Sequence, residues 1–209
     1  MSEQAIKKIL ITGANGFIGG SLMRYYQNQG QDVVGVDLVG NGDDIVEGDI
    51  SQPDSISQLL TESDVIIHTA ALVSNAMQDS DMWRVNVLAT RNLIQAAKEH
   101  KVRRFVQISS IVAYGNTAEG ELNETHPVHA DGGSYVLTKL ASEHVVLSEQ
   151  ANDDIEVVII RPGDAYGPGS RPWIIAPLEA IAKNQFMLPE KGEGFFRPIY
   201  IDDLVRGIV

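Results

Sequence analysis

The sequence predicts an α/β fold in which helices cover both faces of one parallel sheet. Short apolar runs alternate along the chain with amphipathic stretches, and parallel strands need crossover connections of this kind. A glycine-rich turn directly follows the first apolar run, and open parallel sheets bind their ligands at that edge, beyond the carboxyl ends of the strands. We therefore expect a doubly wound sheet with a ligand site at one edge.

The expected elements follow in regular order. The strands are predicted at Lys7 to Thr12, Val33 to Asp37, Val65 to His68, Phe105 to Ser109 and Ile155 to Ile160, with a short third strand closed by Asp49 and Ile50. Amphipathic patterns predict helices over 17–29, 54–61, 82–99 and 135–151. The stretch 162–172 is rich in glycine and proline, so we expect a loop that leads towards substrate-binding elements.

The run Thr12 to Gly19 predicts a binding site for a dinucleotide pyrophosphate. Gly13 permits the tight turn, Gly16 lets the backbone approach the phosphates, and Gly19 lets the following helix lie close to the strand. The helix N-terminus adds free amide groups and partial positive charge. The Gly-x-x-Gly-x-x-Gly spacing differs from G-x-G-x-x-G and lacks the Gly-Lys-Ser/Thr of a P-loop. A glycine turn that binds nothing is the alternative.

Asp37 favours NAD as the cofactor, and a solvated strand end is the alternative interpretation of this residue. It ends the second strand at roughly the expected 20 residues beyond the glycines, where a carboxylate accepts hydrogen bonds from the ribose hydroxyls of NAD. NADP would need a nearby cation, yet no Lys or Arg occurs between Arg24 and Arg84. Asp49 is placed near the adenine amino group, although Asp also favours turns. The prediction is a Rossmann-type sheet that binds NAD.

Composition agrees with a cytoplasmic enzyme domain. The chain has 209 residues, 44% of them hydrophobic, and no cysteine, which excludes disulfides and thiolate chemistry. A net charge of −12 disfavours nucleic acid and anionic membranes as partners. No apolar run approaches the ~18 residues of a membrane-spanning helix. We expect no metal site, because His126 and His129 flank Pro127 without acidic or cysteine partners at metal spacing.

Tyr135 and Lys139 form a Tyr-x-x-x-Lys pair, which a helix places one turn apart. An ammonium beside the phenol is expected to lower the pKa of Tyr135, so that it exchanges a proton with a carbinol or ketone. Taken alone, a Tyr and a Lys four residues apart on a helix are usually an exposed pair with no role in function. Ser109 and Ser110, at the end of a predicted strand, add a hydroxyl that could hold the reacting oxygen.

Together these segments resemble an extended short-chain dehydrogenase/reductase of the NAD-dependent epimerase/dehydratase family. The matching segments run in the family's order over nearly the whole chain. They are Thr12 to Gly19, Asp37, Gly48-Asp49-Ile50, His68-Thr69-Ala70-Ala71, Val85-Asn86-Val87, Ser109-Ser110, Tyr114-Gly115, Tyr135 to Lys139, Arg161-Pro162-Gly163 and Tyr166-Gly167-Pro168-Gly169.

The resemblance implies that Ser110 polarises the substrate oxygen, Tyr135 is the acid/base and Lys139 is its partner. Ser109 is the less favoured serine, Asn86 is either a site residue or a buried structural amide, and His68 is a strand-end residue beside the cofactor. The implied cofactor-binding residues are Gly13, Asn15, Gly16, Phe17, Ile18, Gly19, Asp37, Asp49, Ile50, Thr69, Ala70, Ala71, Leu72, Asn86, Tyr135, Lys139, Pro162 and Gly163.

Departures from the family pattern bear on the reaction. Similar 4,6-dehydratases carry Asp-Glu directly after the catalytic hydroxyl, where this chain has Ile111 and Val112. Nucleotide-sugar members commonly have an Arg one place away from Arg197, and a shift by one turns a strand side chain to the opposite face. We expect a dehydrogenase or reductase similar to 3β-hydroxysteroid dehydrogenases. A nucleotide-sugar epimerase with tightly bound NAD is the alternative, and a non-catalytic NAD-binding regulatory protein the third.

The expected domains are 1–163, which binds NAD and carries the Ser/Tyr/Lys set, and 164–209, a partial substrate-binding region. Similar proteins run on for roughly a hundred residues, so the small C-terminal lobe is expected to be incomplete. Arg171 and Trp173 are expected to meet a substrate or the rest of that lobe. Similar proteins also form homodimers by packing two helices from each copy, here 82–99 and 135–151.

Overall fold

Six strands of the first unit form one parallel sheet. In chain order they are β1 (Lys8–Thr12), β2 (Asp32–Asp37), β3 (Ile45–Glu47), β4 (Val65–His68), β5 (Arg104–Ile108) and β6 (Glu156–Ile160). Their order across the sheet is β3-β2-β1-β4-β5-β6, and every neighbouring pair is parallel. The order reverses beside β1, so the carboxyl ends of β1 and β4 flank the crevice in which such sheets bind ligands. The predicted α/β class with a parallel sheet is confirmed.

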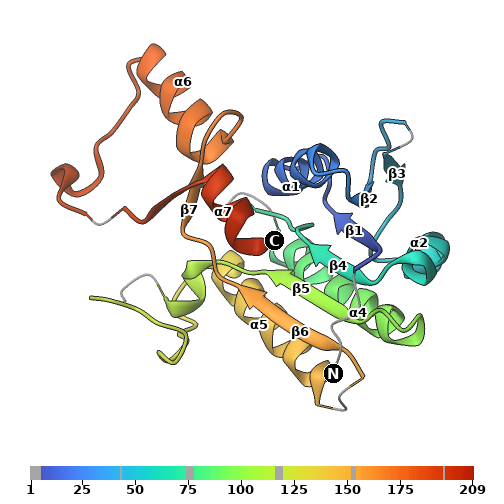
Figure 1. Ribbon diagram of the computed structural model, residues 1–209. Coiled ribbons are helices and arrows are strands. Elements are labelled where there is room, and N and C mark those ends of the chain that lie inside the picture. The colour runs from blue at the N-terminus through green and yellow to red at the C-terminus, as the bar shows by residue number, and fades with distance from the viewer. Residues whose placement is uncertain (1–5, 43, 74–77, 116–119, 152–153, 195) are drawn as a thin grey trace. The chain divides into compact units, whose positions relative to one another are not determined.

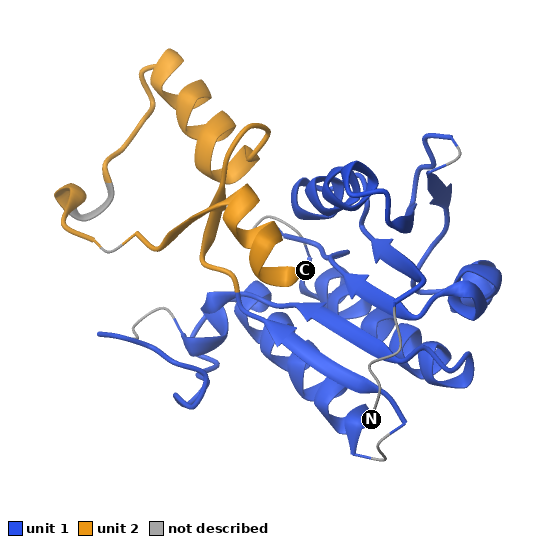
Figure 2. Cartoon of the chain, in the orientation of Figure 1, with its two compact units in different colours: residues 1–161 blue, residues 162–209 orange. Residues whose placement is uncertain are grey.

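The computed structural model describes residues 6–42, 44–73, 78–115, 120–151, 154–194 and 196–209. The chain divides into two compact units, Met1–Arg161 and Pro162–Val209 (Figure 2). None of the described helices combines the length and the apolar character that a bilayer crossing requires.

Helices cover both faces of the sheet. The helices of the first unit are α1 (Phe17–Asn28), α2 (Ser57–Glu62), α3 (Asp79–Trp83), α4 (Thr90–Glu99) and α5 (Ser134–Gln150). Figure 1 shows α4 and α5 side by side on one face, with α1 on the opposite side. The main core cluster joins Leu10, Ile66 and Phe105 of the sheet to Leu93 of α4 and Val146 of α5. Burial of each such side chain contributes about 1.5–3 kcal/mol.

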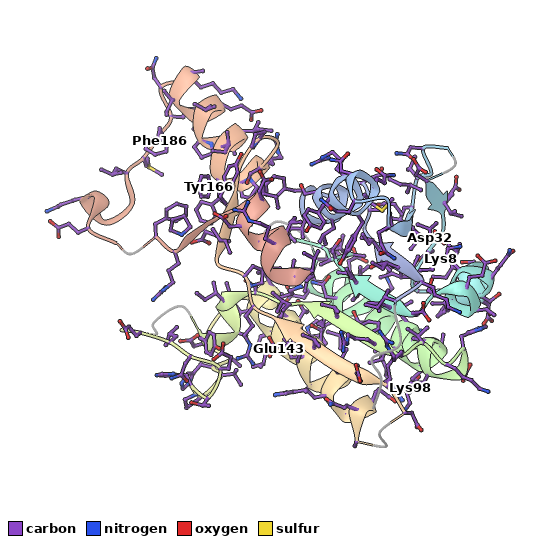
Figure 3. All side chains as sticks on the ribbon, viewed as in Figure 1. Lys8, Asp32, Lys98, Glu143, Tyr166 and Phe186 are labelled. Carbon is purple, nitrogen blue, oxygen red and sulfur yellow. The ribbon has the colours of Figure 1, made fainter. Side chains whose placement is uncertain are left out.

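The second unit contains a small parallel pair, β7 (Asp164–Tyr166) and β8 (Pro198–Tyr200), with α6 (Ala176–Ala182) and α7 (Ile201–Ile208). The Tyr166 and Tyr200 rings meet edge to face with centroids 5.4 Å apart, and Trp173 packs on Phe196 at 4.9 Å. Much of its apolar surface is uncovered, including Phe186, which Figure 3 labels on the segment after α6.

Three local predictions differ from the structure. The strand β3 ends at Glu47, because the chain turns where the Asp49 carboxylate accepts a hydrogen bond from the Ser51 amide at 2.8 Å. The segment 82–99 is helical throughout but not regular: α3 and α4 flank a π-helix, Arg84–Ala89, and the Thr90 hydroxyl donates to the Asn86 carbonyl at 2.9 Å. The expected loop 162–172 contains β7 and the start of a second π-helix, Arg171–Ile175.

Candidate functional site

The glycine turn leaves no room for side chains. Gly13 has a φ of +68°, and a Cβ added there would lie 2.7 Å from the backbone of Ala70. A Cβ on Gly19 would lie 2.2 Å from the Gly13 carbonyl oxygen. Helix α1 begins at Phe17 without a side-chain N-cap, so its first amides are not capped by the protein. This cradle fits the pyrophosphate of a dinucleotide.

The Asp37 carboxylate faces the same turn. It accepts hydrogen bonds from the Asn15 amide at 2.9 Å and from the Leu38 amide at 2.8 Å. The bond from Asn15 joins the glycine turn to the end of β2 and fixes the carboxylate beside the glycine cradle. The ribose of the expected cofactor would lie there. Asp49 is engaged in its own turn, and Ile50 is 8% exposed and packs in the core.

The segment after β4 closes the other side of the cradle. The Thr69 hydroxyl donates to the Thr12 carbonyl at 2.7 Å, and the Thr69 amide donates to the same oxygen at 3.2 Å. Asn86 holds Leu72 twice: its Oδ1 accepts from the Leu72 amide at 2.7 Å, and its Nδ2 donates to the Leu72 carbonyl at 3.0 Å. The expected cofactor-lining backbone from Thr69 to Leu72 is therefore held in place by side chains.

Asn86 also reaches the helix that carries Tyr135. Its Nδ2 donates to the Thr138 hydroxyl at 3.1 Å, and Asn86 is 2% exposed. The side chain is a buried amide bonded to groups of the protein, and its role beside the cofactor stays a prediction. Through this amide the loop after β4 is joined to α5.

Ser110 and Tyr135 meet at the end of β5. Ser110 acts on the Tyr135 phenol, whose pKa it lowers, and the Ser110 Oγ accepts a hydrogen bond from the Val112 amide at 3.3 Å. Burial raises the pKa of Tyr135 above its usual 10.0, and the Ser110 hydrogen bond only partly offsets this. Ser109, by contrast, is buried, with 3% of its surface exposed. A buried hydroxyl is less accessible to a substrate, which favours Ser110 as the site hydroxyl.

Lys139 lies one helical turn after Tyr135 and is 4% exposed. Its Nζ donates to the Ile108 carbonyl at 2.6 Å. Burial lowers the pKa of Lys139 to about 8, and Glu143 acts in the opposite direction. The expectation that Lys139 lowers the pKa of Tyr135 is wrong for this structure, because the effect of burial on the phenol prevails.

Sequence reasoning missed an ion pair behind the site. Glu143, labelled on α5 in Figure 3, binds Arg161 through two hydrogen bonds of 2.9 and 2.7 Å. The Arg161 guanidinium lies 4.7 Å from the centre of the Tyr114 ring, and Tyr114 belongs to the turn that follows Ser110. The pair therefore connects α5 to the Ser110 turn. The available signal was the position of Glu143, one turn beyond Lys139 on the same helix.

Two predicted cofactor residues, Pro162 and Gly163, belong to the second unit. A Cβ on Gly163 would lie 2.3 Å from the Arg197 carbonyl oxygen, so close packing against that backbone requires glycine. Arg197 directly precedes β8, and its carbonyl accepts from the Asp164 amide at 2.8 Å. In this unit Arg171 lies near Glu179, with nitrogen–oxygen distances of 3.4 and 3.5 Å.

Comparisons with known proteins agree with this geometry. Residues 9–209 match the model of the NAD dependent epimerase/dehydratase family. The low-salt glycan biosynthesis protein Agl12 of Haloferax volcanii is 30% identical over 93% of this chain and 69% of its own length. The UDP-glucose 4-epimerase of Vibrio cholerae is 32% identical over 85% of this chain and 58% of its own length.

Solved structures give the same result. The UDP-glucuronic acid 4-epimerase of Bacillus cereus, in complex with UDP-glucuronic acid and NAD, superposes with a TM-score of 0.84 at 29% identity, covering 96% of this chain and 71% of that one. Other relatives are dTDP-glucose 4,6-dehydratases of Streptomyces and a 3 beta-hydroxysteroid dehydrogenase/Delta 5-->4-isomerase of Mycobacterium tuberculosis. The relatives therefore include several reaction types.

Proposed function

Because the chain belongs to the NAD-dependent epimerase/dehydratase family, we propose that it is an oxidoreductase that transfers hydride reversibly between nicotinamide and an alcohol or ketone carbon of a small substrate. Bound NAD would supply the hydride chemistry. The observation that carries the proposal is the contact between Tyr135 and Ser110, one helical turn from the buried Lys139.

The chain's own residues fit NAD. The glycine cradle and the uncapped start of α1 would hold the pyrophosphate, and Asp37 would accept hydrogen bonds from the ribose hydroxyls. A 2′-phosphate would meet the Asp37 carboxylate, which disfavours NADP. The backbone from Thr69 to Leu72 would line the other side.

The proton chemistry falls to Tyr135. The raised pKa of its phenol keeps the proton on Oη at neutral pH, so Tyr135 would donate this proton to a ketone oxygen in the reductive direction. Ser110 would hold the same oxygen by hydrogen bonding. Lys139, whose pKa of about 8 leaves it cationic at neutral pH, would stabilise the phenolate that remains. In the oxidative direction Tyr135 takes the proton back.

We infer that the substrate is an alcohol or ketone and that the reaction is not a 4,6-dehydration. Ile111 and Val112 form the turn after Ser110 and offer no acid or base for the elimination of water. Arg197, which is displaced by one place from the Arg common in nucleotide-sugar members, directly precedes β8 and is not part of that strand. Both features support a reductase similar to the 3 beta-hydroxysteroid dehydrogenase relative.

The similarity to the Bacillus cereus epimerase favours a second candidate. A nucleotide-sugar epimerase would oxidise a sugar carbon and reduce it again with the same NAD. Such an enzyme retains NAD through purification and shows no net oxidation or reduction. Absorbance and mass spectrometry of the purified protein separate the two candidates.

Substitution of Tyr135 by Phe tests the proposal. Against a panel of secondary alcohols, ketones and UDP-sugars, Tyr135→Phe should lower turnover by about 10² to 10⁴-fold and leave NAD binding intact. Tyr25→Phe, on α1, is the matched control and should retain activity. Equal turnover of Tyr135→Phe and the wild type would refute the assigned role of Tyr135.

We also propose a homodimer that works in the cytoplasm. Trp83, Leu88 and Leu147 are large apolar side chains that stand exposed on the α3–α4 segment and on α5, 40%, 53% and 46% accessible respectively. Helices packed in pairs across a two-fold axis would bury them. The absence of cysteine supports a reducing compartment.

A further inference from the structure

A chain of hydrogen bonds passes through the His68 ring and joins the two sides of the candidate site. The His68 Nδ1 lies 2.6 Å from the Thr12 hydroxyl, at the end of β1 where the glycine turn begins. The His68 Nε2 lies 2.9 Å from the Thr90 hydroxyl, at the start of α4. His68 is 1% exposed, so both contacts are shielded from water.

The remaining hydrogen bonds determine which group is the donor and which the acceptor at each step of this hydrogen-bond chain. Thr90 donates its single hydroxyl proton to the Asn86 carbonyl at 2.9 Å, so it must accept from the ring and the Nε2 must carry a proton. A neutral ring then has a lone pair on Nδ1, to which Thr12 donates. The Thr12 oxygen is left to accept from the Ala70 amide at 3.4 Å. The chain therefore runs from Ala70 through Thr12, His68 and Thr90 to Asn86.

The surroundings keep the ring neutral. Burial, together with the charge of Lys139, lowers the pKa of His68 to about 3. The ring of Phe105 covers His68 with centroids 5.6 Å apart. A proton on Nδ1 would leave the Thr12 hydroxyl without its acceptor. The hydrogen bonds therefore favour the Nε2-protonated tautomer, and burial favours the neutral ring over the cation.

Beyond Asn86 the chain reaches the catalytic helix. The Asn86 side chain holds Leu72 and donates to Thr138, whose hydroxyl donates to the Tyr135 carbonyl at 3.1 Å. One arm of His68 thus supports the glycine turn and Ala70. The other arm supports Leu72 and the first turn of α5.

We propose that His68 is a positioning residue, which as its Nε2-protonated tautomer holds the backbone of the cofactor cradle in register with the helix that carries Tyr135. The role rests on the proposed function, because the cradle has this meaning only if the chain binds NAD. His68 itself contacts no substrate and moves no proton during the reaction.

The tautomer of His68 can be measured by NMR, with no assay of enzyme activity. Long-range proton–nitrogen spectra of the chain labelled at its histidine nitrogens should show a protonated Nε2 and an unprotonated Nδ1 for His68. This pattern should persist from about pH 8 to about pH 5, across the usual histidine pKa. The Nδ1-protonated tautomer, or a ring that gains a proton in this range, would overturn the proposal.

Two substitutions of His68 each keep one of its two hydrogen bonds. His68→Asn places an acceptor near the Nδ1 position and keeps the bond from Thr12, whereas His68→Gln places a donor near the Nε2 position and keeps the bond to Thr90. We expect His68→Gln to weaken NAD binding about tenfold and to retain the slow exchange of the Leu72 amide hydrogen. We expect His68→Asn to bind NAD within about threefold of the wild type and to lose that protection.

The matched controls act on the other described histidine–threonine contact, His100 Nδ1 to the Thr61 hydroxyl at 2.7 Å. Both His100→Asn and His100→Gln should leave NAD affinity and Leu72 exchange unchanged. If the two His68 variants change both readouts equally, His68 only stabilises the fold and the positioning role is refuted. A wild-type chain that binds no NAD would instead overturn the proposed function and the role of His68 with it.

Discussion

Lys139 donates a hydrogen bond from its buried Nζ to the carbonyl oxygen of Ile108, at 2.6 Å. Ile108 is the last residue of β5 and immediately precedes Ser109 and Ser110, so this bond fixes the helix of Tyr135 against the turn of Ser110. The spacing between Tyr135 and Ser110, the residues that we propose as acid/base and polarising hydroxyl, therefore depends on a lysine that is only 4% exposed.

Burial of Lys139 should give the stability of the chain a distinct pH dependence. The folded-state pKa is lowered from 10.5 to about 8, so between these values the unfolded chain holds a proton that the folded chain has released. The free energy of unfolding should rise with pH across this window, by up to about 3 kcal/mol. Urea unfolding of the wild type and of Lys139→Met measures the difference; the rise should disappear in Lys139→Met and remain in the exposed control Lys183→Met. A rise of equal size in Lys139→Met would contradict the assignment.

Breaking the pair between Glu143 and Arg161 should cost much more than breaking an exposed pair. The Glu143 side chain is 2% exposed, and Glu143→Gln leaves a guanidinium with a neutral partner in a half-buried position. We expect a loss of about 2–4 kcal/mol. The control, Glu62→Gln, removes the exposed partner of Lys8 and should leave the free energy of unfolding nearly unchanged, because solvent screens such a pair. Equal losses in chemical unfolding would show that the inner pair contributes no special stability.

A methyl group on Gly19 should block the cradle. Its Cβ would lie 2.2 Å from the Gly13 carbonyl oxygen and 2.7 Å from the Thr69 hydroxyl, so α1 must shift away from the turn. Gly19→Ala should lose about 1–3 kcal/mol of stability and bind NAD at least about tenfold more weakly. Gly207→Ala, where nothing lies within 4 Å of the added atom, is the control and should retain both properties. Unchanged NAD affinity in Gly19→Ala would remove the glycine turn from the site.

A charge on the exposed face of the π-helix should prevent pairing of two copies. Leu88 is 53% exposed, and a glutamate there would be buried without a partner in the proposed dimer. Sedimentation of Leu88→Glu should show a monomer, whereas the wild type and Val46→Glu, altered on the edge strand β3, should remain dimers. A monomeric wild type would rule this interface out.

Much of this fold follows from local patterns. The apolar runs around Leu10, Ile66 and Phe105 mark buried parallel strands, and the glycines after Thr12 mark the turn, because both depend on a few neighbouring residues. Tyr135 and Lys139 fall on one helix as their spacing predicts. The family assignment made from these segments is confirmed by the match over residues 9–209.

The remaining features depend on partners distant in the chain. The sequence shows His68 only as a polar strand end, because its partners Thr12 and Thr90 become visible once β1, β4 and α4 are assembled. The direction of the Tyr135 pKa shift was wrong for the same reason: burial is a property of the packed site, whereas the spacing to Lys139 is local. The short strands β7 and β8 carry too few residues for a recognisable pattern.

Whether the chain binds NAD is measured by calorimetric titration of the purified protein with NAD and with NADP, after a check for cofactor already bound. We predict that NAD is bound, either reversibly or as retained cofactor, and that NADP binds at least about tenfold more weakly because its 2′-phosphate meets Asp37. In Asp37→Ala this preference should shrink. A chain that binds neither nucleotide, or that prefers NADP, would contradict the proposed function.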